Sequence, residues 1–306
     1  MDEDSPAVAQ APAAKQPRSG PVSKVSFISK VKAETIEEKA VGYWSNGADD
    51  DGGLFEGVHL QERAANLKAD PEVDRIATEK ALDNLLENKV ARDIPREEGK
   101  YMKKLTTRWE KCWRKKASST TDEWEFKVRF VGREYKWAEF REDLFAPGAA
   151  YCTGRIVDLM ALKLEVPTFT LDCTDAYHQA PELEDIVVEP PPEYLARLAA
   201  EGRSTHIWWK LERQLPGRRP AGQRWIDHFC GIATTALDFE RCACAPQFYW
   251  GRERGIGFEL HGDDVHGFGA KHEIEKFKVD LGPHIKFRDG GVHGEGACYD
   301  HLKRPR

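Results

Sequence analysis

The chain has 306 residues, a formal net charge of −6 at pH 7, 40% hydrophobic residues and 32% charged residues. This length suits one large domain or two ordinary ones, and the apolar fraction is sufficient to bury a core. The acidic balance excludes a protein that is basic throughout, so any contact with nucleic acid has to come from local patches. No apolar run approaches the roughly 18 residues of a spanning helix, so no membrane partner is expected.

The seven cysteines form no CxxC pair, and their number is odd. With no segment that resembles a secretory signal, we expect reduced thiols in an intracellular protein. Cys242 and Cys244 stand near His228 in the sequence, but this spacing matches no established zinc pattern. Ordinary packing is the favoured interpretation of these two cysteines.

The first 60 residues are expected to be a disordered segment. Residues 1–30 are rich in Ala, Pro, Ser and Lys without periodicity, and residues 40–58 carry Gly and Asp clusters typical of a loop. The first regular element is a helix expected over residues 72–90, where apolar side chains recur at helical spacing. Asp70–Pro71 supplies a capping residue and a first-turn proline.

Residues 104–114 and 123–133 alternate aromatic or β-branched residues with polar ones, which predicts a long β-hairpin. A period of two places Lys127 and Arg129 side by side on one face, roughly 7 Å apart at about 3.3 Å per residue. These cations either keep an exposed strand soluble or form a two-pronged clamp for phosphate oxygens. The opposite face would carry Trp124, Phe126, Val128 and Phe130.

A loop from residue 143 is expected to lead into an amphipathic helix that ends at residue 164. Residues 166–177 then predict a buried strand that runs into a turn or a short helix. Asp172 directly follows the apolar part of this strand, where a carboxylate is costly to bury unless it is paired or bound to metal. The alternative is that Asp172 merely caps the end of the strand.

Residues 258–269 predict a strand, a tight turn and a second strand, with Asp263 and Asp264 at the bend. The simpler interpretation is a solvated turn in which Asp serves only its turn propensity. The alternative is that two neighbouring carboxylates on a rigid hairpin hold a divalent cation, which relieves their repulsion.

Several blocks, in this order, resemble the reverse transcriptase domain of copia-type retrotransposon polyproteins over about residues 72–270. The block Lys127–Arg133 is similar to KARLVARG, Leu144–Pro147 to TFAP, and Leu171–Tyr177 to LDVKTAF. The remaining blocks are Asp185–Tyr194, which is similar to a stretch ending in QPPGF; Leu211–Trp225, which is similar to LxxxLYGLKQAPRxW; and His261–Asp264, which stands where the family has YVDD.

The resemblance implies an α+β fold with right-hand polymerase fingers and palm, an antiparallel palm sheet, and a thumb that is largely missing. It implies an RNA-directed DNA polymerase domain over residues 61–270, with residues 271–306 as a truncated C-terminal part of the same domain. The expected partners are an RNA or DNA template with its primer, deoxynucleoside triphosphates and other segments of a retroelement polyprotein. A cytoplasmic particle, the nucleus or both would be the location.

In that resemblance, Asp172 and Asp263 bind two Mg²⁺ ions, with Mn²⁺ as a substitute, and Asp264 completes the catalytic set. Lys127 and Arg129 are expected to clamp the triphosphate. The remaining substrate-binding residues are Tyr177, which would lie beneath the incoming sugar and reject a ribose 2′-hydroxyl, and Arg219. Tyr177 as a plain core aromatic is the alternative.

Four residues depart from the family pattern. His261–Gly262 replaces Tyr-Val before the acidic pair, Pro220 replaces a Gln that can donate a hydrogen bond, and Arg218 replaces an apolar residue. Two other functions therefore stay open beside the polymerase. One is an inactive, truncated remnant that binds nucleic acid through residues 103–116, with Trp109 and Trp113 stacking on bases. The other is an unrelated metal-dependent phosphotransferase or hydrolase that uses the same three aspartates.

Overall fold

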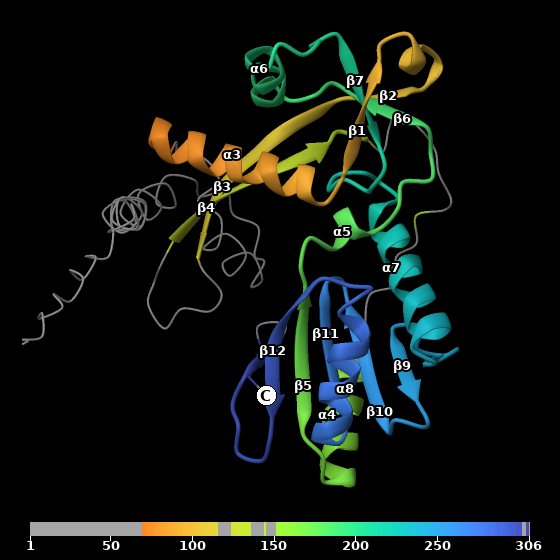
Figure 1. Ribbon diagram of the computed structural model, residues 1–306. Helices are drawn as coiled ribbons and strands as arrows, with labels where there is room; N and C mark the ends of the chain where they lie inside the picture. The colour runs from red at the N-terminus through yellow and green to blue at the C-terminus, as the bar shows by residue number, and fades with distance from the viewer. Residues whose placement is uncertain (1–68, 116–123, 136–143, 145–150, 302–303, 306) are drawn as a thin grey trace, which may run out of the picture. The chain divides into compact units, whose positions relative to one another are not determined.

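The computed structural model describes residues 69–115, 124–135, 144, 151–301 and 304–305 (Figure 1). Three expected features lie outside these residues: the disordered segment 1–60, the loop of the long hairpin, and most of the Leu144–Pro147 block. The chain divides into two compact units: Met1–Arg75 with Cys112–Lys127, and Ile76–Lys111 with Val128–Arg306. Within the described ranges, no helix is both long enough and apolar enough to cross a membrane.

The expected α+β class is confirmed, since the described residues form six α-helices together with several mainly antiparallel sheets. Helix α3 (Pro71–Glu87) confirms the first expected helix. The backbone N–H of Glu72 donates to the Asp70 carboxylate over 3.1 Å, so Asp70 caps this helix as its sequence position predicts.

The first unit holds the distal parts of strands β3 (Thr107–Lys115) and β4 (Trp124–Gly132), which pair with each other and confirm the expected hairpin. Its small core joins Trp113 and Trp124 to Val73. Because Trp113 is only 1% exposed and its ring contacts Phe126 at 5.1 Å between centroids, it packs inside the unit. The expectation that Trp113 stacks on bases is therefore wrong.

The second unit contains a four-stranded sheet of order β1-β7-β6-β2. Its strands are β1 (Ala91–Pro95), β7 (Ile207–Leu211), β6 (Ile186–Val188) and β2 (Lys103–Leu105). The core beside it includes residues of α3 and of α6 (Pro192–Ala200), and the 3₁₀-helix Glu98–Tyr101 follows β1. Trp109 is packed here against Phe130, and its indole N–H donates to Glu193, so this indole too is engaged within the protein.

The same unit contains a six-stranded sheet of order β12-β5-β11-β10-β9-β8, antiparallel throughout (Figure 1). The expected strand ending in a short helix is confirmed as β5 (Thr168–Cys173) and α5 (Ala176–Gln179). The expected acidic hairpin is confirmed as β10 (Ile256–His261) and β11 (Asp264–Phe268). The other strands are β12 (Phe287–His293), β9 (Phe248–Gly251) and β8 (Glu240–Arg241), while β13 (Asp300–His301) and β14 (Arg304–Pro305) form a separate pair.

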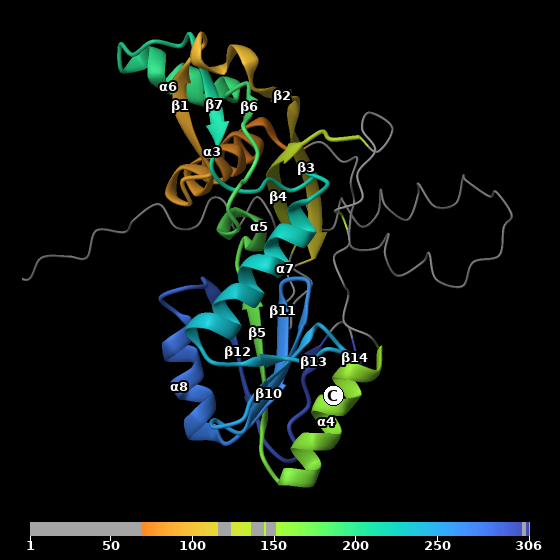
Figure 2. The ribbon, with the colours of Figure 1, turned by 90° about the vertical axis from the view of Figure 1, so that its right-hand side faces the viewer.

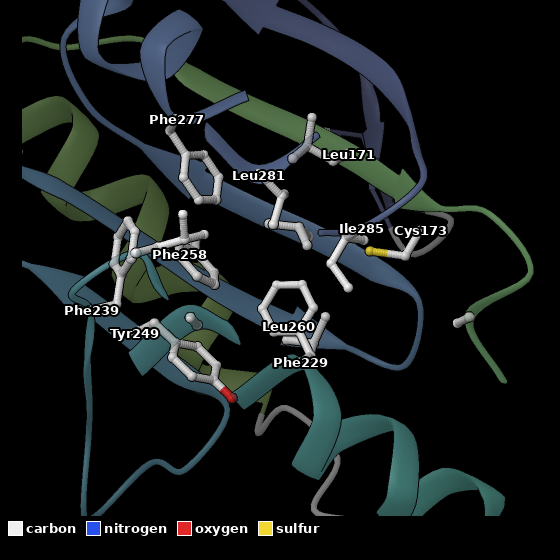
Figure 3. Packing of buried hydrophobic residues seen from close by; sticks show 14 of the residues in the cluster. Leu171, Cys173, Phe229, Phe239, Tyr249, Phe258, Leu260, Phe277, Leu281 and Ile285 are labelled. Atoms are coloured by element: carbon white, nitrogen blue, oxygen red, sulfur yellow. The ribbon is translucent and has the colours of Figure 1, made fainter. Parts of the chain in front are cut away.

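Helices cover both faces of the six-stranded sheet. Helix α4 (Tyr151–Leu164) lies on one face and α8 (Lys271–Leu281) on the other (Figure 2). Helix α7 (Ala221–Gly231), which continues into a π-helical turn (Ile232–Ala236), shares the core of the α8 face. Phe258 lies at the centre of that core, with ring centroids 5.0 Å from Phe239 and 5.4 Å from Phe277 (Figure 3).

A close approach of two glycines fixes the chain just before α7. The N–H of Gly132 donates to the carbonyl of Pro216 over 2.8 Å, and a Cβ on Gly217 would lie 2.2 Å from the Gly132 carbonyl oxygen. Gly217 also has a φ of +84°, a conformation that glycine adopts at no steric cost. The contact sets the position at which Arg218 enters the protein interior.

Candidate active site

A two-residue turn joins β10 to β11 and presents the acidic pair. His261 pairs with Asp264 across the hairpin, which leaves Gly262 and Asp263 as the two central residues. Gly262 has a φ of +65° at the first central position, as tight hairpin turns of the primed types require. The glycine is therefore needed by the turn itself.

Two hydrogen bonds hold this turn against the rest of the unit. The N–H of Cys173 donates to the Asp263 carbonyl over 2.7 Å, which ties the turn to the end of β5. The indole N–H of Trp225, a residue 1% exposed on α7, donates to the Gly262 carbonyl over 2.7 Å. Because both turn carbonyls have fixed donors, the turn that carries Asp263 and leads into Asp264 is held rigidly.

The three expected aspartates gather at the ends of two neighbouring strands. Asp172 on β5 and Asp264 on β11 are directly opposed across the antiparallel pair, so their side chains leave the same face of the sheet. Asp263 follows in the turn. Burial raises the pKa of the Cys173 thiol, and the charges of Asp263, Asp172 and Asp264 raise it further.

The charges at the site are unevenly balanced. Asp263 is exposed in the turn, yet partial desolvation of its carboxylate raises its pKa; the charge of Asp172 adds to the increase, and Arg129 and His261 oppose it. The Arg288 guanidinium, 70% exposed on β12, lies 3.7 Å from the Asp172 carboxylate. Negative charge thus exceeds what these partly exposed cations neutralise, a setting that favours binding of a further cation.

Two more expected residues lie beside the aspartates. Arg129 on β4 is close enough to Asp263 to lower its pKa. Tyr177 on α5 is 37% exposed. Burial is the main cause of its raised pKa, and the negative charge of Asp263 adds to the increase. Tyr177 is thus a half-exposed side chain at the acidic turn rather than a plain core aromatic.

The other two expected substrate residues are Lys127 and Arg219. Lys127 lies two residues before Arg129 in β4, is half-buried and belongs to the first compact unit. Arg219 is half-buried, and its backbone N–H donates to Glu134 over 2.9 Å. Their roles in binding substrate stay predictions.

Sequence reasoning gave no role in the interior to Arg218, which has a fully buried side chain. Its guanidinium binds Glu182 through two nitrogens at 3.0 Å and Glu134 through a third at 3.1 Å. The signal was present as a charged residue at a position apolar in the family block, but its carboxylate partners lie 36 and 84 residues away. The network fixes the start of α7, and α7 in turn carries Trp225 to the acidic turn.

The donor set fits a hard divalent cation in its chemistry, because carboxylate oxygens are the ligands that Mg²⁺ prefers. Within the described ranges, no three His, Cys, Asp or Glu side chains are already arranged closely enough to form a metal centre. Partial desolvation is the main cause of the raised pKa of Asp263, and the charge of Asp172 adds to it; a bound cation would oppose both effects. Asp172 and Asp263 would be the ligands, with Asp264 beside them.

The chain matches no family model, and no curated protein is similar enough to count as a match. Three carboxylates, a guanidinium and a half-exposed phenol can bind a metal–triphosphate, position a hydroxyl group and screen developing negative charge.

Proposed function

We propose that the chain is an RNA-directed DNA polymerase domain of the copia-type retrotransposon kind. The observation that supports it most is the opposition of Asp172 and Asp264 across β5 and β11, with Asp263 in the tight turn between β10 and β11. The ordered sequence blocks imply a central strand and an adjacent hairpin that together carry three aspartates. Strand β5 and the β10–β11 hairpin are arranged in this way. Arg129 and Tyr177 at the same turn extend the match to the substrate side.

In this proposal the six-stranded sheet with α4, α7 and α8 is the palm. The four-stranded sheet and the β3–β4 hairpin belong to the fingers. The substrates are deoxynucleoside triphosphates and a primed RNA or DNA template, and other segments of a retroelement polyprotein are the natural partners. A cytoplasmic particle, the nucleus or both are the proposed location.

Each site residue has a separate task in nucleotidyl transfer. Asp172 and Asp263 would hold two Mg²⁺ or Mn²⁺ ions, whose chemistry when bound would be to activate the primer 3′-hydroxyl and to stabilise the pyrophosphate leaving group. Asp264 contributes negative charge that keeps the cations at the turn. Arg129 and Lys127 bind triphosphate oxygens and screen the charge that develops in the transition state.

The other two residues act on the rest of the nucleotide. Tyr177 lies beneath the incoming sugar, where its ring excludes a ribose 2′-hydroxyl. Arg219 binds substrate phosphate from the segment before α7. Trp225 and Cys173 keep the turn in place through their hydrogen bonds to its two carbonyls.

Primer extension tests the proposal. Purified protein is given a labelled DNA primer on an RNA template, all four deoxynucleoside triphosphates and Mg²⁺ or Mn²⁺, and the products are separated by length. Template-dependent extension is expected. A salt-dependent gel shift of the same primer–template without extension would contradict the polymerase and favour the nucleic-acid-binding remnant. Hydrolysis of nucleotides without a template would favour the hydrolase.

A further inference from the structure

A pair of thiols lies in contact on the loop between β8 and β9. The Sγ atoms of Cys242 and Cys244 are 3.3 Å apart. Cys244 is exposed and Cys242 is partly exposed, so small oxidants in solution can reach both. The proposed polymerase chemistry uses neither residue.

The loop holds these thiols together by its backbone. The N–H of Cys242 donates to the Phe248 carbonyl, and the N–H of Phe248 donates to the Ala245 carbonyl, at 2.9 and 2.8 Å. The Arg241 side chain binds the Pro246 carbonyl over 2.6 Å. A loop closed in this way keeps both thiols at its tip and needs little movement to join them.

The two thiols differ in reactivity. The Cys244 thiol and the backbone N–H groups of Ala245 and Cys244 donate to Cys242 and lower the pKa of its thiol. The same contact raises the pKa of Cys244. Since the thiolate is the reactive form, Cys242 is the nucleophile and Cys244 the residue that reacts second.

We propose that Cys242 and Cys244 form a peroxide-sensitive redox site that closes reversibly to an intraloop disulfide. The Cys242 thiolate attacks one oxygen of a hydroperoxide and the O–O bond breaks, so Cys242 becomes a sulfenic acid. The hydroxide or alkoxide that leaves takes up the proton that the Cys242 thiol had released to solvent. Cys244 then attacks the Cys242 sulfur; the S–S bond forms, the S–O bond breaks, and water leaves with the proton of Cys244. The two thiols have lost two electrons, and the peroxide has gained them.

A metal site is the less suitable use of this pair. Structural zinc takes four ligands, whereas a disulfide needs only the two thiols that are in contact. A disulfide across one intervening residue is small, exposed and strained, and such bonds are readily reduced by dithiols. The modification is therefore reversible.

The chain offers an unusually clean test, because trypsin releases residues 242–252 as one peptide that contains both cysteines and no other. The folded protein is treated with hydrogen peroxide, remaining thiols are alkylated, and the peptides are weighed. The 242–252 peptide is expected to lose two hydrogen atoms, to carry no alkyl group, and to regain both thiols after dithiothreitol. Cys152 and Cys298, which are exposed single cysteines in other tryptic peptides, serve as internal controls for exposure without a neighbour.

Two variants separate the roles. In peroxide-treated Cys244→Ser protein, Cys242 is expected to stop at a sulfenic acid, which dimedone labels. This labelling of Cys242 should be at least about tenfold faster than the labelling of Cys244 in peroxide-treated Cys242→Ser protein. Alkylation of both thiols in the 242–252 peptide while Cys152 and Cys298 are oxidised would overturn the proposal. Direct formation of sulfonic acids there without the disulfide would overturn it too.

Discussion

The buried Arg218 network gives a sharp test of how the site is supported. Replacement of Arg218 by methionine keeps the approximate volume and removes the positive charge from a side chain with no exposure to solvent. The carboxylates of Glu182 and Glu134, with side chains 1% and 6% exposed, then lose their main partner. Removing one member of a buried ion pair costs about 3–5 kcal/mol. Lys103 still contacts Glu134, so we expect a loss of about 3 kcal/mol.

Urea unfolding at pH 7.5 measures this loss as a lower midpoint with an unchanged slope. Arg203→Met is the matched control, because that arginine is 55% exposed in its ion pairs with Asp93 and Glu201 and should cost at most about 1 kcal/mol. Equal, small losses in the two variants would refute the reasoning. A loss near 3 kcal/mol for Arg218→Met alone would support it.

The pH dependence of the same comparison has a definite sign. Burial would raise the pKa of Glu134, but the Arg219 N–H, Lys103 and Arg218 together hold it below the usual value of a Glu side chain. A depressed pKa contributes stability above the unfolded pKa and loses it as the pH falls through the folded pKa. The deficit of Arg218→Met should therefore be largest above about pH 5 and shrink as the pH falls below about 4.

Three further variants test other parts of the account. Gly217→Ala should lower the free energy of unfolding in urea by at least about 3 kcal/mol, because the new Cβ would meet the Gly132 carbonyl oxygen. The control is Gly202→Ala, also at positive φ but in open space, which should cost about 1–2 kcal/mol. Similar losses in the two variants would refute the close contact. Trp225→Phe keeps the packed ring and loses the N–H on the acidic turn, so unfolding should show a loss of about 1–2 kcal/mol, and no loss would contradict the hydrogen bond. Asp263→Asn should raise the melting temperature at pH 7.5 without Mg²⁺, since a carboxyl group whose folded pKa is raised destabilises the fold once it ionises. The gain should disappear below about pH 4, and a lower melting temperature at pH 7.5 would contradict the raised pKa of Asp263.

The local elements of the fold could be predicted from the sequence because local patterns determine them. The alternation around Gly262 and Asp263 specifies a hairpin, and the apolar run before Asp172 specifies a strand that ends there. From the sequence alone, the short strand Lys103–Leu105 could not be distinguished from the first strand of the long hairpin. Its strand β2 pairs in parallel with β6, whose sequence lies some 80 residues further on, and no local pattern encodes such a partner.

The candidate site divides in the same way. Asp172, Asp263 and Asp264 could be singled out from the sequence because they stand in blocks that follow one another in the order of a known family, whereas the burial of Arg218 depends on carboxylates that only the tertiary fold supplies. The alternation in β10 suggests one wet face, yet the strand is buried along most of its length. The reason is that α4 covers the second face of the sheet, which no pattern within β10 can reveal.

The most direct test of the proposed polymerase is the rate of single-nucleotide addition to a DNA primer on an RNA template, measured under single-turnover conditions with Mg²⁺. Wild-type protein is compared with Asp172→Asn protein and with Asp227→Asn, a matched change at an exposed aspartate on α7 that accepts a hydrogen bond only from Gln223 among the contacts seen. Loss of a metal ligand removes about 4 kcal/mol of transition-state stabilisation, so the rate should fall about a thousandfold in Asp172→Asn and stay unchanged in Asp227→Asn. Equal rates in all three proteins, or no addition by any of them, would contradict the proposed site.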